Sequence, residues 1–587
     1  CSEGNHPSAP AHLSFSRPYD PAVSKTEHAD AVVSELSTIL TSGRLSNENK
    51  QVITAAYLSK LNGAEDADAA LRLATQLILT APEFHTTNLV SKTGAMREQP
   101  ELPRATGSPY KAIVYTMFGG GCDSYNMLVP LKCTGENDLY AEYQEIRQDV
   151  ALSNTTLLPL EPVDNQVCET FGVHPELPSI QQLFNDSDLL FFANHGVLTM
   201  PTDKENYWKD TVTQLFAHNF MQLAAAKIDP MKREDGTGIL GRVRDLLSKQ
   251  GLSVGAFSLD SNSISLIGTP GENPTPMILS NGGVVQFNEN PSDDGMDAAI
   301  ASLNGEVEAH SGAFGDWYSE TLLKSLAHNK LLYDTLVDKE TEVTFPDSHL
   351  GRQLQMVAKM IDSRNERGTD ADVFFISKGG WDTHSQVLNN QVNLFADVDA
   401  SFKAFADEMK AKNVWNNVVL VETSDFARTL TPNGGAGTDH AWGGHYMMMG
   451  GSVKGKQIVG EYPESIAEGS ALNIGRGRII PSRGWESVFL PLAQWAGVGN
   501  ETADLDYVCP NRENFDEANI PEMTELFLEV TNPPSSPPTK GPSASPTTLE
   551  PSKSPTGSPI EVVTNNPTAN PSKAPTPSPN HPTDSPT

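Results

Sequence analysis

The chain has 587 residues, of which 41 are Lys or Arg and 74 are Asp or Glu, so its formal net charge is −33. A surface this acidic repels nucleic acid and anionic membranes, so we expect neither as a partner. No run of about 18 apolar residues occurs, so no transmembrane helix is predicted.

A small helical segment is predicted over residues 30–92. Apolar residues recur every three or four positions from Ala31 onward, Gly43 interrupts the pattern, and Ser46 is a candidate N-cap for the next helix. A further helix, DADAALRLATQLIL, ends before Pro82. We expect these helices to pack on the main domain.

Four buried strands are predicted further along the chain. The segments are KAIVYTMF (111–118), DLLFFANHG (188–196), ADVFFIS (371–377) and NNVVLVETSD (416–425). Amphipathic helical patterns lie between them, as in HLGRQLQMVAKMI. Strands that alternate with helices favour a parallel sheet covered on both faces. Residues 105–525 are therefore predicted to form one α/β domain.

The last segment, residues 532–587, is rich in Pro, Ser and Thr and has almost no aromatic residues. Such a composition cannot bury a core, so the tail is predicted to be disordered or polyproline-like. Ser/Thr-Pro tracts often carry O-glycans on secreted or wall-associated proteins, so the composition favours secretion and attachment to a cell wall. A plain flexible linker is the alternative. The five cysteines form no CxxC pair, which argues against a zinc ribbon.

Acidic and histidine residues gather where the predicted strands end. They are Asp123 after the first strand, Asp382 and His384 after the third, Asp425 at the end of the fourth, and Asp439, His440 and His445 in the glycine-rich loop that follows. In an open α/β sheet, ligands bind beyond the carboxyl ends of the strands. Carboxylates and imidazoles together suit divalent ions, and zinc, calcium, magnesium and manganese all remain open.

Each of these residues also has an ordinary structural interpretation. A single Asp after a strand is often a helix N-cap, and a lone His is often a hydrogen-bonded core residue. Their joint placement favours a metal or anion site instead. Arg428 could hold an anionic substrate group bidentately or form a surface salt bridge. Ions at such a site would suit the hydrolysis of phosphate or sulfate esters.

Several motifs occur in a fixed order: FGGGCDSYNMLVPL, LGRQLQMVAKMI, SKGGWDTH and TSDFARTLTPNGGAGTDHAWGGH. Together they resemble the domain-of-unknown-function 1501 family, a sulfatase-like group of the alkaline phosphatase superfamily, over about residues 105–520. The helical segment 30–92 resembles the C-terminal end of the domain-of-unknown-function 1800 family. That second resemblance implies that the protein extends upstream of Cys1.

The first resemblance implies a mostly parallel central sheet flanked by helices, with metal ions at its carboxyl edge. Asp123 and Asp425 match superfamily ligands, whereas Phe426 stands where the superfamily has a histidine. His440 or His445 would substitute for that histidine. No cysteine begins the C/S-x-P-x-R motif of formylglycine sulfatases. The candidate nucleophiles are then Thr199 and Ser124.

Two functional hypotheses follow. In the first, the protein is a secreted or wall-associated metal-dependent hydrolase of phosphate or sulfate esters, with an anionic ester or polysaccharide as substrate. In the second, it is a catalytically inactive binding or cell-wall structural module that retains the fold. A hydroxyl or thiol within reach of the bound ions would distinguish the two, because without one only water can attack the ester.

Overall fold

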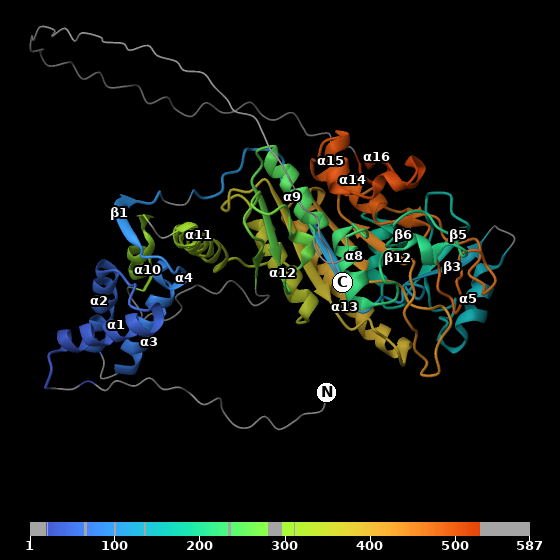
Figure 1. Ribbon diagram of the computed structural model, residues 1–587. Coiled ribbons are helices and arrows are strands. Elements are labelled where there is room, and N and C mark those ends of the chain that lie inside the picture. The colour runs from blue at the N-terminus through green and yellow to red at the C-terminus, as the bar shows by residue number, and fades with distance from the viewer. Residues whose placement is uncertain are drawn as a thin grey trace, which may run out of the picture. The chain divides into compact units, whose positions relative to one another are not determined.

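The computed structural model describes residues 19, 22–63, 67–98, 101–133, 137–232, 236–279, 296–309 and 312–528. The predicted tail, 532–587, and Cys1 lie outside these residues. The main sheet consists of β2 (Lys111–Phe118), β6 (Leu189–Gly196), β7 (Val254–Ser258), β8 (Met277–Ile278), β10 (Ala371–Lys378), β11 (Val418–Ser424), β12 (Gly444–Met449), β13 (Ile458–Gly460) and β14 (Arg483–Gly484). Its order is β13-β6-β12-β11-β2-β10-β7-β8, with β14 paired to β6. Figure 1 labels two neighbouring strands of this sheet, β6 and β12.

The sheet is mostly parallel. Only β12 runs against its neighbours, pairing antiparallel with β11 and β6, while β11, β2, β10 and β7 run in one direction. The four predicted strands are β2, β6, β10 and β11, each within two residues of its predicted ends. The predicted fold, a central and mostly parallel sheet flanked by helices, is confirmed.

Both faces of the sheet are buried, because successive side chains of a strand point to opposite sides. Val114 of β2 joins the core that includes α12 (His349–Asp362) and α13 (Val387–Ala411). Tyr115, the next residue, joins the core that includes α8 (His218–Lys227), α9 (Ile239–Lys249) and α14 (Glu486–Ala496). This double burial explains why the strands are continuous apolar runs rather than alternating patterns.

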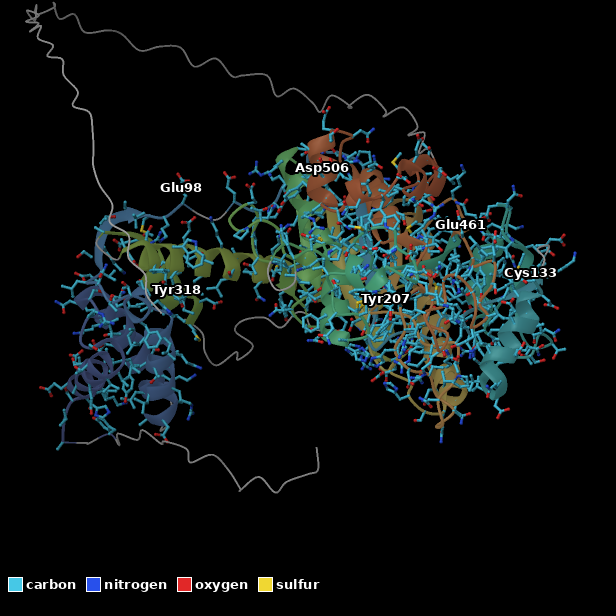
Figure 2. All side chains as sticks on the ribbon, turned by 45° about the vertical axis from the view of Figure 1, so that its right-hand side comes forward. Glu98, Cys133, Tyr207, Tyr318, Glu461 and Asp506 are labelled. Carbon is cyan, nitrogen blue, oxygen red and sulfur yellow. A yellow bond between two sulfur atoms is a disulfide. The ribbon has the colours of Figure 1, made fainter. Side chains whose placement is uncertain are left out.

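A small antiparallel sheet lies outside the main one. It contains β3 (Leu128–Cys133), β4 (Leu158–Leu160) and β5 (Cys168–Val173), and β3 contacts α5 (Leu139–Arg147). A disulfide joins Cys133, labelled in Figure 2, to Cys168. Cys122 and Cys509 are buried free thiols. Disulfides persist mainly in oxidising compartments.

The N-terminal helices are α1 (Lys25–Thr41), α2 (Asn47–Gly63), α3 (Ala67–Leu79) and α4 (Pro82–His85). They share a hydrophobic core with α10 (Met296–Asn304), and β1 (Ser91–Met96) pairs with β9 (Glu306–Ala309). The helical unit predicted from residues 30–92 therefore packs against a segment about 200 positions later in the chain, and its packing on the main domain stays a prediction. Within the described residues, no helix is both long and apolar enough to cross a membrane.

Glu486, the first residue of α14, gives the fold a pH dependence. Its side chain is buried, and burial raises its pKa to about 7. The folded state therefore keeps a proton that the unfolded state releases near pH 4.5, so stability is lost as pH rises from about 4.5 to about 7. We expect Glu486→Gln to be more stable than the wild type at pH 8, by up to about 3 kcal/mol, and little changed near pH 4.5. Urea denaturation at both pH values measures the difference. An equal effect at both would contradict the titration.

Candidate metal centre

The loops after β2, β10 and β11 meet at the carboxyl edge of the sheet. Gly120, two residues beyond β2, has a φ of +119°, and a Cβ there would lie 2.5 Å from the backbone nitrogen of Asp382. Only glycine permits this approach. The backbone N–H of Gly120 also donates to Asp425 Oδ1 at 3.1 Å. The glycines of the FGGG motif thus bring the three strand ends together.

Three imidazoles surround the carboxylate of Asp382. The Nε2 atoms of His218, His384 and His440 lie 3.5, 3.1 and 3.2 Å from Asp382 Oδ1. The possible ligand atoms of His218, Asp382 and His440 all lie within 4.8 Å of one another. His384 lies beside Asp382 and His440, with its Nε2 3.0 Å from that of His440. It is not a member of this group of three.

The other ring nitrogen of each histidine has an oxygen partner. Nδ1 lies 2.6 Å from Asp425 Oδ2 in His218, 3.0 Å from Asp439 Oδ1 in His384, and 2.7 Å from the carbonyl oxygen of Phe216 in His440. A carboxylate or carbonyl oxygen can only accept, so each Nδ1 donates. In a neutral ring, Nε2 then carries the lone pair.

This arrangement directs nitrogen lone pairs at an anionic carboxylate. Burial lowers the pKa of His440, which favours its neutral form. Burial alone would raise the pKa of Asp382, but the hydrogen bond and charge of Arg428, with His384 and His218, hold it below its ordinary value. Lone pairs and a carboxylate that face one another are what a cation needs. Oxygen acceptors at the second nitrogen are also typical of metal-binding histidines. The residues therefore fit a divalent ion.

Arg428 is buried and fully engaged. Its Nη1 donates to Asp382 Oδ1 at 2.7 Å and to the carbonyl oxygen of Gly120 at 2.9 Å, and its Nε donates to the carbonyl oxygen of Thr438 at 3.1 Å. The side chain orients Asp382 and has no exposed face for a substrate anion.

Asp439 links the centre to a partly exposed arginine. It accepts hydrogen bonds from His384 and Asn433 and pairs with Arg476, whose side chain is 49% exposed. Burial raises its pKa, but these three partners together hold the pKa well below the ordinary value. Asp439 is therefore ionised and fixes the orientation of His384.

Asp123, predicted as a ligand, lies buried behind the centre. Its Oδ2 accepts from Arg147 Nη2 at 2.7 Å and from Thr438 Oγ1 at 3.1 Å. Among the described residues, Thr438, the neighbour of Asp439, links the Asp123 carboxylate to the cluster. The buried ion pair of Asp123 with Arg147 is a structural role that the position after a strand does not reveal.

Three other candidates lie apart from the cluster, with no hydrogen bond or ion pair to it among the described residues. Ser124 Oγ accepts from the backbone N–H of His445. The ring of His445 stacks on Tyr462, and burial lowers its pKa to about 3. Thr199 is buried, and its carbonyl oxygen accepts from Asn511. The structure thus brings together Asp382, His384, Asp425, Arg428, Asp439 and His440.

Sequence reasoning missed His218, which opens α8. Both His218 Nδ1 and Gln222 Nε2 contact Asp425 Oδ2, at 2.6 and 2.9 Å. The signal in the sequence was the spacing of four between these residues, which puts them on one helix face. Arg476 was also missed, because it lies in a loop that follows no predicted strand. The fold and site together define a mixed α/β domain with a candidate metal centre at the carboxyl edge of its sheet.

A family model described as a protein of unknown function, DUF1501, matches residues 323–470. The range contains Asp382, His384, Asp425, Asp439 and His440, so the resemblance is confirmed over this part of the chain. Asp123 and His218 lie outside it. No match supports the resemblance of residues 30–92 to the domain-of-unknown-function 1800 family, which stays a prediction. No curated protein matches the chain.

Several solved structures align with the chain at low similarity. The C-terminal periplasmic domain of EcEptC from Escherichia coli, in complex with Zn, is 8% identical over 60% of this chain and 77% of its own, with a TM-score of 0.26. The PsFucS1 sulfatase from Pseudoalteromonas sp. is 10% identical over 71% and 74%, with a TM-score of 0.29. The lipoteichoic acid synthase LtaP from Listeria monocytogenes is 10% identical over 57% and 60%, with a TM-score of 0.22. Similarity at this level says nothing about activity.

Proposed function

We propose that the domain is a metal-dependent hydrolase of phosphate or sulfate esters, and that His218, Asp382 and His440 hold one divalent ion. The observation that carries the proposal is the convergence of imidazole Nε2 atoms on the Asp382 carboxylate, each with its Nδ1 held by an oxygen. Two imidazoles and one carboxylate favour zinc over calcium or magnesium. Three protein ligands leave a position open, as catalytic sites require.

A bound ion would supply Lewis-acid stabilisation of the charge that develops on an ester oxygen. Arg428 would position Asp382 for binding. The role of holding the substrate anion, expected for Arg428, falls to Arg476 in this proposal. Its guanidinium lies beside Asp439 and is about half exposed, at 49%. An exposed guanidinium can bind a phosphate or sulfate group through two parallel hydrogen bonds.

His384 and Asp439, predicted as ligands, are better suited to proton transfer. The side chain of His384 is 48% exposed, against 30% for His218 and 23% for His440, so it faces the open side of the centre. Asp439 fixes its tautomer by accepting from Nδ1. A histidine oriented in this way can take a proton from an attacking water and return it to the leaving group.

Water is the attacking group in this proposal. The two hydroxyls considered as nucleophiles, on Thr199 and Ser124, are buried and separate from the cluster. Cys122 and Cys509 are buried thiols, and burial raises the pKa of each, which keeps them protonated and poorly nucleophilic.

We also propose that the substrate ester is carried on an anionic extracellular polymer such as a polysaccharide. Asp382 and His384 are about half exposed, at 46% and 48%, so the centre opens to a large substrate. The Cys133–Cys168 disulfide supports an oxidising, extracellular location. The Pro/Ser/Thr-rich composition of residues 532–587 supports attachment to a wall.

A second function, a binding module without turnover, is favoured by Phe426. The superfamily position expected to hold a histidine carries this apolar ring, which is buried and lies 4.9 Å from the ring of His218 and 4.8 Å from that of His440. Phe426 cannot ligate, so a second ion has one ligand fewer than the resemblance implies.

Elemental analysis of the purified chain after dialysis, with assays on p-nitrophenyl phosphate and p-nitrophenyl sulfate, tests the proposal. We expect about one zinc ion per chain and ester cleavage that stops on chelation and returns with zinc. His384→Gln should keep the ion and lose cleavage. A bound ion without any cleavage, or neither an ion nor cleavage, would overturn the hydrolase and favour the binding module.

Asp425 should act on the ion through His218. Asp425→Asn removes the charged partner of Nδ1, so we expect zinc affinity about 10- to 100-fold weaker. Competition with a chromogenic chelator measures the affinity. Asp347→Asn, at a side chain 94% exposed, is the matched control and should change nothing. Unaltered affinity in the Asp425 variant would show that His218 is not a ligand.

A further inference from the structure

A cavity of about 340 Å³ lies at the β7 side of the main sheet, away from the metal centre. Its wall includes Val254 to Phe257 of β7, residues of α9 and of the segment before β8, and the end of α11 (Gly312–Leu336). Ser253 and Thr369, which precede β7 and β10, close one end, so the cavity lies toward the amino ends of these strands. It shares no residue with the centre, and its volume is within the range of small-molecule sites.

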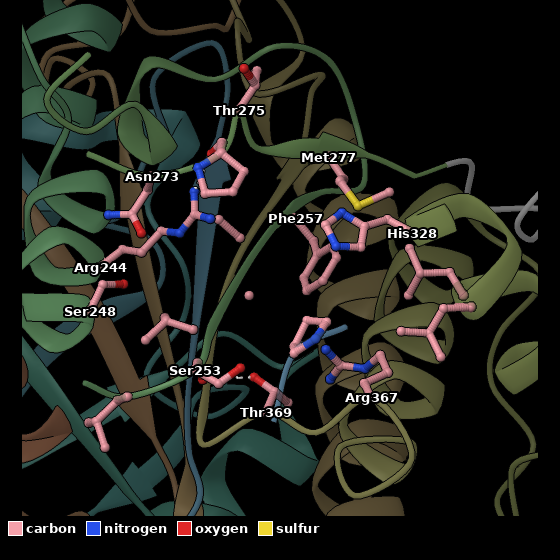
Figure 3. A pocket seen from close by; sticks show the side chains of 18 residues that line it. Arg244, Ser248, Ser253, Phe257, Asn273, Thr275, Met277, His328, Arg367 and Thr369 are labelled. Atoms are coloured by element: carbon pink, nitrogen blue, oxygen red, sulfur yellow. Dashed lines mark hydrogen bonds between the residues drawn. The ribbon is translucent and has the colours of Figure 1, made fainter. Parts of the chain in front are cut away.

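The two sides of the cavity differ in character. Figure 3 shows Arg244 and Ser248 of α9 on one side, with Phe257, Met277 and His328 facing them. Aliphatic side chains such as Leu252, Leu331 and Leu332 complete the apolar surface. The described lining contains two arginines and one histidine but no carboxylate, although the whole chain has 74 acidic residues and 41 basic ones.

Arg244 is a nearly buried cation of this lining with an unpartnered donor. Its residue is 6% exposed, its Nη1 donates to the carbonyl oxygen of Pro274 at 2.7 Å, and its Nε has no hydrogen-bond partner. Among the described residues it forms no ion pair. The carboxylate of its neighbour Asp245 is engaged by Thr269, Asn273 and Tyr507. The charge of Asp245 acts favourably on Arg244 without pairing with it, so the nearly buried guanidinium keeps an unpartnered donor, and an anion in the cavity would be stabilised there.

The other basic side chains do not compete for this role. Arg367 is paired with Asp372, its Nη1 lying 3.0 Å from Oδ1. Burial, with the charge of Lys324, lowers the pKa of His328, which is therefore neutral near pH 7. Of the described lining, Arg244 therefore offers the unpartnered cationic donor, and apolar side chains face it.

We propose that this cavity binds an amphiphilic monocarboxylate, whose carboxylate pairs with Arg244 and whose hydrocarbon part packs between Phe257, Leu331 and Leu332. The carboxylate would accept a hydrogen bond from the unpartnered Nε of Arg244. The hydrocarbon part of the ligand would be removed from contact with water. This site is separate from the proposed ester hydrolysis and does not depend on it.

Isothermal titration calorimetry of the full chain with decanoate and with decan-1-ol tests the assignment. We expect decanoate to bind with one site per chain and at least about 10-fold more tightly than the alcohol, because a hydrogen bond to a charged group is worth about 1.5–3 kcal/mol. Equal binding of the two compounds, or no binding of decanoate, would overturn the proposal.

Two variants distinguish the contribution of the Arg244 charge to binding from that of the space in the cavity. Arg244→Met should weaken decanoate binding to the level of the alcohol and leave alcohol binding unchanged. Leu331→Trp should fill the cavity and remove binding of both, which keeps the proposal testable if the arginine variant does not fold. Arg352→Met, at a surface arginine paired with Asp347, is the matched control. Decanoate affinity unchanged in either cavity variant would show that it binds elsewhere.

Discussion

Replacing Asp382 by Asn is expected to remove the bound ion and to lower ester hydrolysis about a thousand-fold or more, since a Lewis-acid ion supplies several kcal/mol of transition-state stabilisation. The amide keeps an oxygen that can accept from Arg428, whose Nη1 lies 2.7 Å from Oδ1, so the loop should hold its conformation. The negative charge is lost, however, and the buried Arg428 then repels a cation without compensation.

Metal content by elemental analysis and turnover of p-nitrophenyl phosphate are the two measurements. Asp347→Asn serves as the control, because that side chain is 94% exposed and pairs only with Arg352 among the described residues. A variant that retained its zinc would remove Asp382 from the ligand set. A variant that lost zinc but kept its turnover would instead show that the ion is not needed for ester hydrolysis.

The strands that carry the site could be predicted because each has a strong local signal. KAIVYTMF and its three counterparts each contain a continuous apolar run, and strands buried on both faces need no alternation. The antiparallel strand β12 was missed, because its GHYMMM segment follows a glycine-rich loop and has few β-branched residues. The strand β7, which lies between β10 and the edge strand β8, is short and was missed for a similar reason.

The candidate centre could be predicted only in part. Asp425 follows β11 directly, and Asp382 and His384 lie in the loop after β10, so the topology of a parallel sheet brings them to one edge. His218 comes from a helix start more than 160 positions before Asp382, and nothing local predicts that this helix lies above the strand ends. Whether Asp425 and Asp439 contact an ion or orient a histidine depends on side-chain geometry that spacing does not determine.

Asp123 is a residue whose position in the sequence predicts a metal ligand, whereas the structure shows a buried ion pair. The sequence places an acidic residue in the loop after β2, as a ligand would be, but cannot show that α5 brings Arg147 to within 2.7 Å of it. The two side chains are 0% and 1% exposed, so each neutralises the other in a region without water contact.

Replacing Arg147 by Met is therefore expected to destabilise the protein by about 3–5 kcal/mol, because it leaves the Asp123 carboxylate buried without a counter-charge. The double variant Arg147→Met/Asp123→Asn should recover most of this loss, since both charges are then removed. Urea denaturation of the two single variants and of the double variant gives the coupling energy between the residues.

Zinc content in the same variants shows whether Asp123 has a structural role or binds the ion. If the ion pair is the whole role of Asp123, the folded double variant binds as much zinc as the wild type. Loss of zinc from Asp123→Asn with unchanged stability would instead return Asp123 to the ligand set that its position after β2 predicts. Thr438, which donates to Asp123 Oδ2 and precedes Asp439, would then be the route by which the buried carboxylate joins the centre.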